Sequence, residues 1–367
     1  MSVYPLIFEP ILKPRIWGGR QLADVLGKPL PPGEPIGESW ELADLPGNES
    51  LVREGPARGW SIRRIMEQWG RDLLGTVQPI RGRFPLLVKF LDASRDLSVQ
   101  VHPSPAAAAA EANADPKDEA WYVIAAQPGA IIYHGLNEGV TRGRVLEALA
   151  RGEVASLLRR VPARPGDCFW LPAGTVHALG AGLLVTEVQT PSDTTYRLFD
   201  WNRVDESTGR PRELHVEQAL RSINFEAPGP PPRQDRTHVA SLWTTVTRLV
   251  TCDRFVLDQV RMAEGAEQSI PYAEPVVWIV LEGAAEIGYA GGVATARRGD
   301  VVLLPAALEK ARMRAVERCV WLEVRIPSPG DLIGYGGQPP ERPASPGKVP
   351  APEGSPSQPR ASAPPQE

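Results

Sequence analysis

RPGDCFWLPAGTVHAL, residues 164–179, and RRGDVVLLPAALEKAR, residues 297–312, share one pattern. Each begins with Arg, a variable residue, Gly and Asp, and runs into an apolar stretch that ends in Leu-Pro-Ala. The Gly-Asp pair suits a tight turn between strands, because glycine tolerates a positive φ. The repeated turn and strand therefore predict that one β unit occurs twice in this chain.

An apolar stretch that begins near an acidic residue precedes each copy. DEAWYVIAAQPGA, residues 118–130, comes before the first copy, and AEPVVWIVLEGAA, residues 273–285, comes before the second. Most of the remaining chain consists of short apolar runs separated by Gly and Pro, which is typical of barrels and sandwiches. We therefore expect a mainly β protein with two β-barrels of one design.

Three segments are expected to be helical. Apolar residues recur at three- and four-residue spacing in 61–75, with Ser61 as the N-cap, and in 143–161, with a break near Gly152. The segment 105–116 is rich in alanine and flanked by prolines. The two periodic segments are expected to pack against the core.

The composition divides the chain into two domains and a tail. We expect a first domain at 1–235, a second at 236–327, and a disordered tail at 328–367, where Pro and Ser are abundant and apolar residues are rare. A second Pro-rich stretch, 227–238, is interpreted as the linker or a long loop.

The overall composition excludes several classes of function. A net charge of −4 without a dense basic block argues against nucleic acid as a partner. No apolar stretch approaches the roughly 20 residues of a membrane-spanning helix, and no secretory signal is expected. The three cysteines are far apart and odd in number, which is typical of reduced thiols. We expect a cytoplasmic protein that contacts neither nucleic acid nor membrane.

The stretch LSVQVHPSP, residues 97–105, places two polar side chains on one face of a strand. Apolar residues alternate with polar ones, so Gln100 and His102 point the same way. The first copy of the repeat adds His177 and Glu119, whereas aligning the second copy on Gly-Asp puts Lys310 opposite His177.

Each of these side chains alone has an ordinary structural explanation, but together they form a plausible metal site. Two imidazoles and one carboxylate are a common ligand set for a catalytic divalent ion, and a glutamine oxygen could be a fourth ligand. The spacing does not distinguish zinc from iron.

Several separated motifs resemble, in order, the short bacterial form of the type I mannose-6-phosphate isomerases. The resemblance covers roughly residues 5–326, and the motifs are RIWGG (15–19), GESWEL (37–42), LSVQVHPS (97–104), KDEAWYVI (117–124) and GDCFWLPAGTVHALGAGLLVTEVQTPSDTTYRLFDWNR (166–203). The resemblance implies two cupin-like (jelly-roll) barrels with a few helices. It also implies the interconversion of mannose 6-phosphate and fructose 6-phosphate through a metal-assisted cis-enediol, with a sugar phosphate as the partner.

The resemblance further implies one Zn²⁺ per chain, in the first barrel alone. Its ligands would be Gln100, His102, Glu119 and His177. The second barrel would pack against the first and supply structure.

Three further residues are candidates for the chemistry. Arg197 matches the family's catalytic arginine and is assigned to substrate or phosphate contact; the alternative is an ion pair with Asp200 or Asp193. Lys117 could bind phosphate or transfer protons, or be an exposed lysine. Glu187 is the candidate acid/base, or else a buried structural glutamate.

The sequence also allows other roles for nearby aromatic residues and two other functions for the chain. His134 is expected at a turn or rim, away from the metal, and Trp17 and Trp40 are expected mainly to pack. A non-haem iron oxygenase could use the same two histidines and carboxylate, and metal analysis with oxygen uptake would distinguish it. A non-catalytic sugar-phosphate-binding protein is the third possibility, against which Lys117, Glu187 and Arg197 count.

Overall fold

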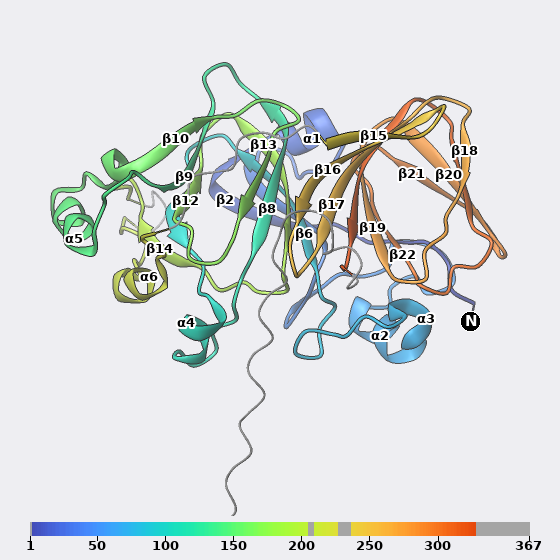
Figure 1. Cartoon of the computed structure of the whole chain (residues 1–367), viewed down its shortest axis with the longest axis horizontal. Coiled ribbons are helices and arrows are strands. Elements are labelled where there is room, and N and C mark those ends of the chain that lie inside the picture. The colour runs from blue at the N-terminus through green and yellow to red at the C-terminus, as the bar shows by residue number, and fades with distance from the viewer. Residues whose placement is uncertain (1, 205–208, 227–235, 328–367) are drawn as a thin grey trace, which may run out of the picture.

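The computed structural model of the protein describes residues 2–204, 209–226 and 236–327. Over these residues the chain is mainly β, as predicted, with two groups of strands side by side and short helices around them (Figure 1). No helix within these ranges is long and apolar enough to cross a bilayer. The predicted tail at 328–367 and most of the predicted linker lie outside the described residues.

The first group of strands consists of two antiparallel sheets whose inner faces meet. The six-stranded sheet contains, in order across it, β11 (Cys168–Leu171), β8 (Glu119–Ala126), β13 (Leu183–Gln189), β6 (Leu87–Ala93), β3 (Ile36–Leu42) and β2 (Ile11–Gly19). The five-stranded sheet contains β10 (Leu158–Pro162), β9 (Ile131–Leu136), β12 (His177–Leu179), β7 (Val99–Val101) and β14 (Tyr196–Phe199).

The second group also pairs a large sheet with a small one. The seven-stranded sheet contains β1 (Leu6–Ile7), β22 (Val301–Leu304), β19 (Val276–Glu282), β24 (Cys319–Arg325), β17 (Val256–Met262), β16 (Thr244–Thr251) and β15 (Arg236–Ser241). The four-stranded sheet contains β18 (Glu267–Ser269), β23 (Arg312–Ala315), β20 (Ala284–Tyr289) and β21 (Gly292–Arg297). A two-stranded ribbon of β4 (Asp44–Leu45) and β5 (Asn48–Glu49) lies outside both groups.

The two groups repeat one topology. The order β22-β19-β24-β17-β16-β15 matches β11-β8-β13-β6-β3-β2, and β21-β20-β23-β18 matches β10-β9-β12-β7. The Gly-Asp turns of the repeat also match, with φ of 91° at Gly166 and 87° at Gly299. In both turns the aspartate accepts a hydrogen bond from a backbone N–H three residues earlier, 2.8 Å from Asp167 and 2.9 Å from Asp300. The pattern in the sequence therefore corresponds to a real duplication of the fold.

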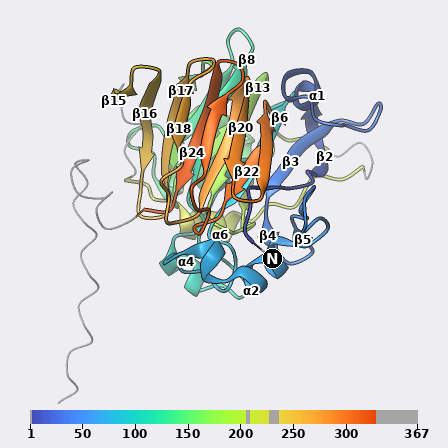
Figure 2. The same cartoon turned by 90° about the vertical axis from the view of Figure 1, so that its right-hand side faces the viewer.

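The two large sheets pack against each other through their outer faces. Strand alternation turns Phe90 and Tyr122 of the first group toward Leu257 and Val277 of the second, in one continuous buried cluster. Figure 2, turned by 90° from Figure 1, shows the large sheet of the second group in front of the first. The inner faces, between each large sheet and its small partner, are thereby left for each group's own core or site.

The helices are shorter than the sequence pattern predicts. The segment 61–75 divides at Gly70, where φ is 48°, into α2 (Ile62–Trp69) and α3 (Arg71–Leu74), and Ser61 caps α2 as predicted. In 143–161 the prediction is wrong beyond Gly152. There α5 (Arg142–Arg151) ends in a left-handed glycine, and a 3₁₀ turn, η1 (Val154–Leu157), leads into β10. The remaining helices are α1 (Gln21–Leu26), α4 (Pro105–Ala109) and α6 (Val216–Ser222).

The three cysteines are unpaired, as predicted. Cys168 and Cys252 are half-buried and Cys319 is buried. Burial raises the pKa of each thiol to about 12. A thiol in that state is a weak nucleophile and a weak metal ligand, so none of the three is a candidate for chemistry.

Candidate metal centre

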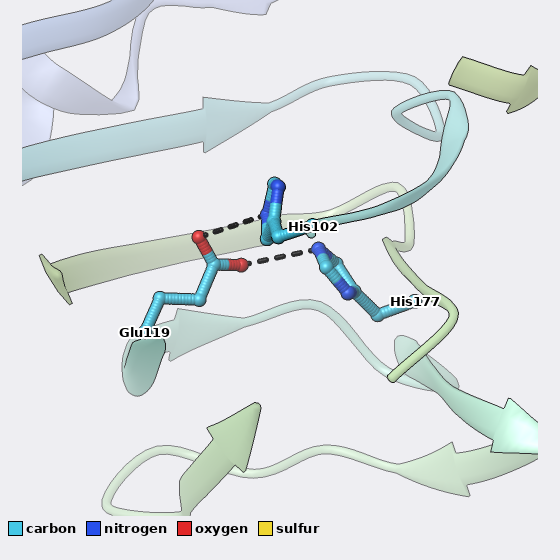
Figure 3. Close-up of side chains that lie close together, drawn as sticks. All are labelled: His102, Glu119 and His177. Carbon is cyan, nitrogen blue, oxygen red and sulfur yellow. Dashed lines mark ion pairs between the residues drawn. The ribbon is translucent and has the colours of Figure 1, made fainter. Parts of the chain in front are cut away.

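Three side chains from separate strands converge inside the first group. His102 follows β7 directly, Glu119 begins β8, and His177 begins β12. Their candidate ligand atoms all lie within 4.8 Å of one another, and all three residues are buried. Figure 3 shows the Glu119 carboxylate pointing between the two imidazoles. The convergence expected from the sequence is therefore present.

The hydrogen bonds of the two histidines fix which nitrogen faces the carboxylate. His102 Nδ1 lies 3.0 Å from the Thr194 carbonyl oxygen, and His177 Nδ1 lies 2.8 Å from the Thr175 carbonyl oxygen. Since a carbonyl only accepts, Nδ1 of each ring carries a proton, and the Nε2 atom of each ring faces Glu119. The Nε2 distances to the carboxylate oxygens are 3.3 Å and 3.1 Å.

The charge states around this group are set by burial and by the one nearby ammonium of Lys117. Burial and the nearby Lys117 lower the pKa of His102 to about 3, so its ring is neutral at neutral pH. Burial opposes ionisation of Glu119, but Lys117 and His102 hold its pKa well below the ordinary value. Both Glu119 oxygens and His102 Nε2 are buried without a well-aligned hydrogen bond, although Lys117 Nζ lies 2.9 Å from Glu119 Oε2. Acceptor atoms that face one another in this way fit a bound divalent cation, and the Thr194 and Thr175 carbonyl oxygens orient the two rings.

Gln100 lies next to this group but is only partly buried. Its Nε2 is 3.2 Å from His177 Nε2, and the backbone of β7 pairs Gln100 with His177. A half-turn of the amide exchanges its nitrogen and oxygen, and would present the oxygen to the same place. Gln100 as a fourth ligand stays a prediction.

Lys117 and Glu187 are both buried beside the metal group. Lys117 Nζ is 2.9 Å from Glu119 Oε2 and 3.9 Å from Glu187 Oε1. Burial lowers the pKa of Lys117, but the two carboxylates outweigh it and raise the pKa above its ordinary value. Glu187 accepts a hydrogen bond from Trp121 Nε1 at 2.7 Å and pairs with Lys89 Nζ at 3.2 Å. The exposed-lysine alternative for Lys117 is therefore wrong.

Arg197 lies on β14, paired with Gln100 on β7. Its Nη1 donates to the Glu213 carbonyl oxygen at 2.8 Å, and its Nε is buried without a partner. Asp200 instead pairs with Arg203 and Arg212. Within the described residues no carboxylate lies within ion-pair distance of Arg197, which removes the structural ion pair considered from the sequence.

A cavity of about 500 Å³ lies beside the metal group, whose neighbours Gln100 and Lys117 form part of its wall. Gln100, Lys117, Glu187 and Arg197 all contribute to its walls. Five further charged residues of the wall were not predicted as site residues from the sequence: Arg15, Glu38, Lys89, Asp193 and Arg212. Lys89 was detectable as the one cation inside the largely apolar β6, but its role depends on pairing with Glu187.

The aromatic and histidine predictions have mixed outcomes. Trp17 is buried and also lines the cavity. Trp40 packs in the core, with Lys89 Nζ 4.6 Å above its ring. His134 is not at a rim: it is buried in β9 and donates from Nε2 to the Trp170 carbonyl oxygen at 2.9 Å. It is a structural histidine outside the metal group.

The second group carries a different set of residues at the equivalent positions. The pairing of Gln268 on β18 with Met313 on β23 repeats that of Gln100 with His177. The Gln-x-His-Pro sequence of the first group becomes Gln-x-Ile-Pro, and Val276 stands where β8 has Glu119. The counterpart of His177 is therefore Met313, not Lys310, which is exposed in a turn.

The apolar residues at these positions form part of one core. Ile270, Val276 and Met313 belong to the same buried cluster. Thioether and aliphatic side chains offer no ligand for a hard divalent cation. The candidate metal centre of the described chain is thus confined to the first group.

Comparisons with known proteins agree on one family. A sequence model described as the catalytic domain of type I phosphomannose isomerase matches residues 6–123. The mannose-6-phosphate isomerase ManA of Bacillus subtilis (strain 168) is 38% identical over 322 residues, which is 87% of this chain and 99% of the relative. The mannose-6-phosphate isomerase of Streptococcus mutans is 34% identical, over 83% of this chain and 93% of the relative. The crystal structure of mannose 6-phosphate isomerase from Bacillus subtilis superposes with a TM-score of 0.80 at 30% identity, covering 88% of this chain and 99% of the other.

Proposed function

The chain belongs to the type I phosphomannose isomerases, and from this premise we propose that it interconverts mannose 6-phosphate and fructose 6-phosphate. The proposal is supported by relatives of that name that match nearly their full length. Its strongest support within the molecule is the buried group of His102, Glu119 and His177, whose candidate ligand atoms lie within 4.8 Å of one another. A polar cavity lies beside this group.

We further propose that this group holds one zinc ion per chain, with Gln100 as a fourth ligand. Two neutral imidazoles and one carboxylate are a usual zinc ligand set that leaves a position open for substrate. Bound zinc would supply a Lewis acid that polarises a sugar oxygen. One carboxylate and a divalent ion together carry a net charge of about +1. This positive charge would stabilise the negative charge that develops on an enediol oxygen.

The isomerisation moves a proton between C1 and C2 of the sugar through a cis-enediol. Glu187 is assigned to carry that proton, because its carboxylate lies in the cavity wall and is held by Trp121 Nε1 and Lys89 Nζ. A carboxylate fixed in this way can take a proton from one carbon and return it to the neighbouring one without leaving its place.

Lys117 and Arg197 are assigned to the substrate. Lys117 lies between Glu119 and Glu187, where its ammonium group can hold a proton beside the sugar oxygens. Arg197 retains N–H donors that no carboxylate occupies in the described structure, and it contributes to the cavity wall. A guanidinium in that state is suited to bind a hydroxyl or phosphate oxygen.

In this proposal the two domains predicted at 1–235 and 236–327 divide the work. The first holds the metal and the sugar phosphate. The second, with Ile270, Val276 and Met313 at the equivalent positions, supports the first through the packed large sheets.

A coupled assay for conversion of mannose 6-phosphate to fructose 6-phosphate tests the proposal. We expect turnover by the protein as purified, loss of turnover after treatment with a chelator, and recovery when Zn²⁺ is added back. A protein that is loaded with metal, folded, and inactive on both sugar phosphates would refute the proposed function.

A further inference from the structure

The walls of the cavity differ in how their charges are balanced. On the β2–β3 side, Arg15 pairs with Glu38 at 2.6 Å, so one cation faces one anion. Near the metal group, the ammonium groups of Lys89 and Lys117 face the carboxylates of Glu119, Glu187 and Asp193. Neither of these parts carries surplus positive charge from its side chains.

The β14 side has a surplus of positive charge. Within the described part of the chain, Arg197, Arg203 and Arg212 gather near the carboxylate of Asp200, and the nearby carboxylate of Glu213 is exposed to solvent. Burial and the charge of Arg212 lower the pKa of Arg197, which records an electrostatic repulsion between the two guanidinium groups. Among the described residues this is the part of the cavity where an added anion would gain most.

Asp200 fixes the Arg212 guanidinium in one orientation. Arg212 Nε donates to Asp200 Oδ2 at 2.8 Å, and its Nη2 donates to Oδ1 at 2.5 Å. Arg203 Nη2 donates to the same Oδ1 at 2.5 Å, and Arg203 Nη1 donates to the Asp96 carbonyl oxygen at 2.6 Å. Asp200 itself is buried. Arg212, which lines the cavity, is thereby held rigidly beside Arg197.

We propose that Arg212 selects for the phosphate of the substrate, that it binds this dianion together with Arg197, and that Asp200 is the positioning residue that orients it. This inference rests on the proposed function, because it names the phosphate subsite of the same cavity. Paired guanidinium groups bind phosphate oxygens through several charge-assisted hydrogen bonds, and a fixed fork loses little entropy on binding. The neutral Arg15–Glu38 pair leaves the opposite wall to the sugar hydroxyls.

The test combines steady-state kinetics with the binding of inorganic phosphate. For Arg212→Gln we expect the KM for mannose 6-phosphate and the Ki of inorganic phosphate to rise together, on the order of 10- to 100-fold, with kcat within about 3-fold. Arg212→Lys should recover part of the affinity, because it keeps the charge and loses the fork. Asp200→Asn should raise KM less than Arg212→Gln does.

Arg63→Gln is the matched control. Arg63 pairs with the buried Asp44 at 2.9 Å, as Arg212 does with Asp200, but it does not line the cavity. Its KM and Ki should equal those of the unmodified protein. Unchanged KM and Ki in Arg212→Gln, or a rise in Arg15→Gln alone, would overturn the inference.

Calorimetric titration with inorganic phosphate separates this inference from the proposed function. Binding of phosphate to the unmodified protein that Arg212→Gln abolishes supports the subsite even if turnover is absent. Turnover of the sugar phosphate by a protein whose phosphate affinity does not depend on Arg212 supports the function and refutes the subsite.

Discussion

The two groups of strands use one topology for different purposes. Where the first group has His102, Glu119 and His177, the second has Ile270, Val276 and Met313, as the pairing of the strands and the Gln-x-His-Pro and Gln-x-Ile-Pro sequences show. The polar positions converge on one another beside a cavity, and the apolar ones fill a core. One topology therefore surrounds a candidate metal centre in the first group and a close-packed interior in the second.

A second pair of equivalent residues differs much less. Trp121 lies opposite Glu187 on β13, and Trp278 lies opposite Glu323 on β24. Each indole donates to its glutamate, at 2.7 Å and 3.3 Å. The cation Lys89 beside Glu187 is replaced by Asp258 in the second group. The indole–carboxylate pair thus belongs to the shared fold, and the surroundings of the carboxylate distinguish the two groups.

The largest effect is expected at the counterparts His177 and Met313. His177→Ala removes one of two imidazoles, so we expect loss of bound metal and a fall in turnover of at least about 10³-fold. Met313→Ala leaves a cavity in an apolar core, so it should lower the free energy of unfolding by about 2–5 kcal/mol while metal content and kcat stay unchanged. Metal analysis, the coupled assay and urea unfolding measure these outcomes. Retained metal in His177→Ala would remove this histidine from the ligand set.

The next effect compares the two glutamates. Glu187→Gln cannot accept a proton, so we expect kcat to fall about 10²- to 10⁴-fold with little change in sugar-phosphate affinity. Burial raises the pKa of Glu323, which lies away from the proposed chemistry, so Glu323→Gln should leave kcat within 2-fold. Steady-state kinetics of both variants measure the difference. An equal fall in kcat in the two variants would show that both carboxylates act only through folding.

The pH dependence of stability should reveal the buried imidazole in the metal-free protein. The pKa of His102 is lowered from 6.5 to about 3, so the unfolded chain binds a proton at pH 5 that the folded chain does not. The free energy of unfolding is therefore highest above about pH 6.5 and decreases as the pH drops toward 3. At pH 5 this histidine alone lowers it by about 2 kcal/mol relative to neutral pH. Urea unfolding of chelator-treated protein at pH 7 and pH 5 measures this loss.

His102→Gln provides the control for that measurement. The variant lacks the titrating ring, so its loss between pH 7 and pH 5 should be smaller by about 2 kcal/mol. The equivalent position in the second group is Ile270, which does not titrate. Identical losses in the variant and the unmodified protein would show that His102 is free to take up a proton in the folded state.

The smallest effect is expected at the two indoles. Trp121→Phe removes a hydrogen bond to Glu187, so kcat should fall several-fold through the freed carboxylate, and stability by about 1 kcal/mol. Trp278→Phe should cost a similar amount of stability and leave kcat unchanged. A fall in kcat that is the same in both variants would mean that the indole does not position Glu187.

The sequence was sufficient for the β class, the duplication and the metal group. Regular alternation in β7 placed Gln100 and His102 on one face, and the Gly-Asp turns marked the two copies. His177 on β12 lies beside β7 in the small sheet, whereas Glu119 begins β8 of the facing large sheet, so their meeting depends on how the two sheets pack.

The remaining features depend on loop lengths and pairing registers. The connection from β7 to β8 is much longer than its counterpart from β18 to β19. Glu119 lies sixteen positions after Pro103, whereas Val276 lies five positions after Pro271, so the equivalence of Glu119 and Val276 cannot be read from spacing in the sequence. The loop after Leu-Pro-Ala is also three residues longer before Met313 than before His177, which misdirects an alignment to Lys310. Arg212 lines the cavity and donates to Asp200, a pairing that depends on how the segment after β14 folds back. Gly70 and Gly152 end helices whose apolar periodicity continues past them.

The most direct test of the account is an anomalous difference map from crystals of the protein, collected on both sides of the zinc absorption edge. We expect one peak per chain, about 2.0–2.2 Å from His102 Nε2, His177 Nε2 and a Glu119 oxygen, and none among Ile270, Val276 and Met313. A peak elsewhere in the chain, or zinc-loaded active crystals with no density between the two imidazoles, would contradict the account.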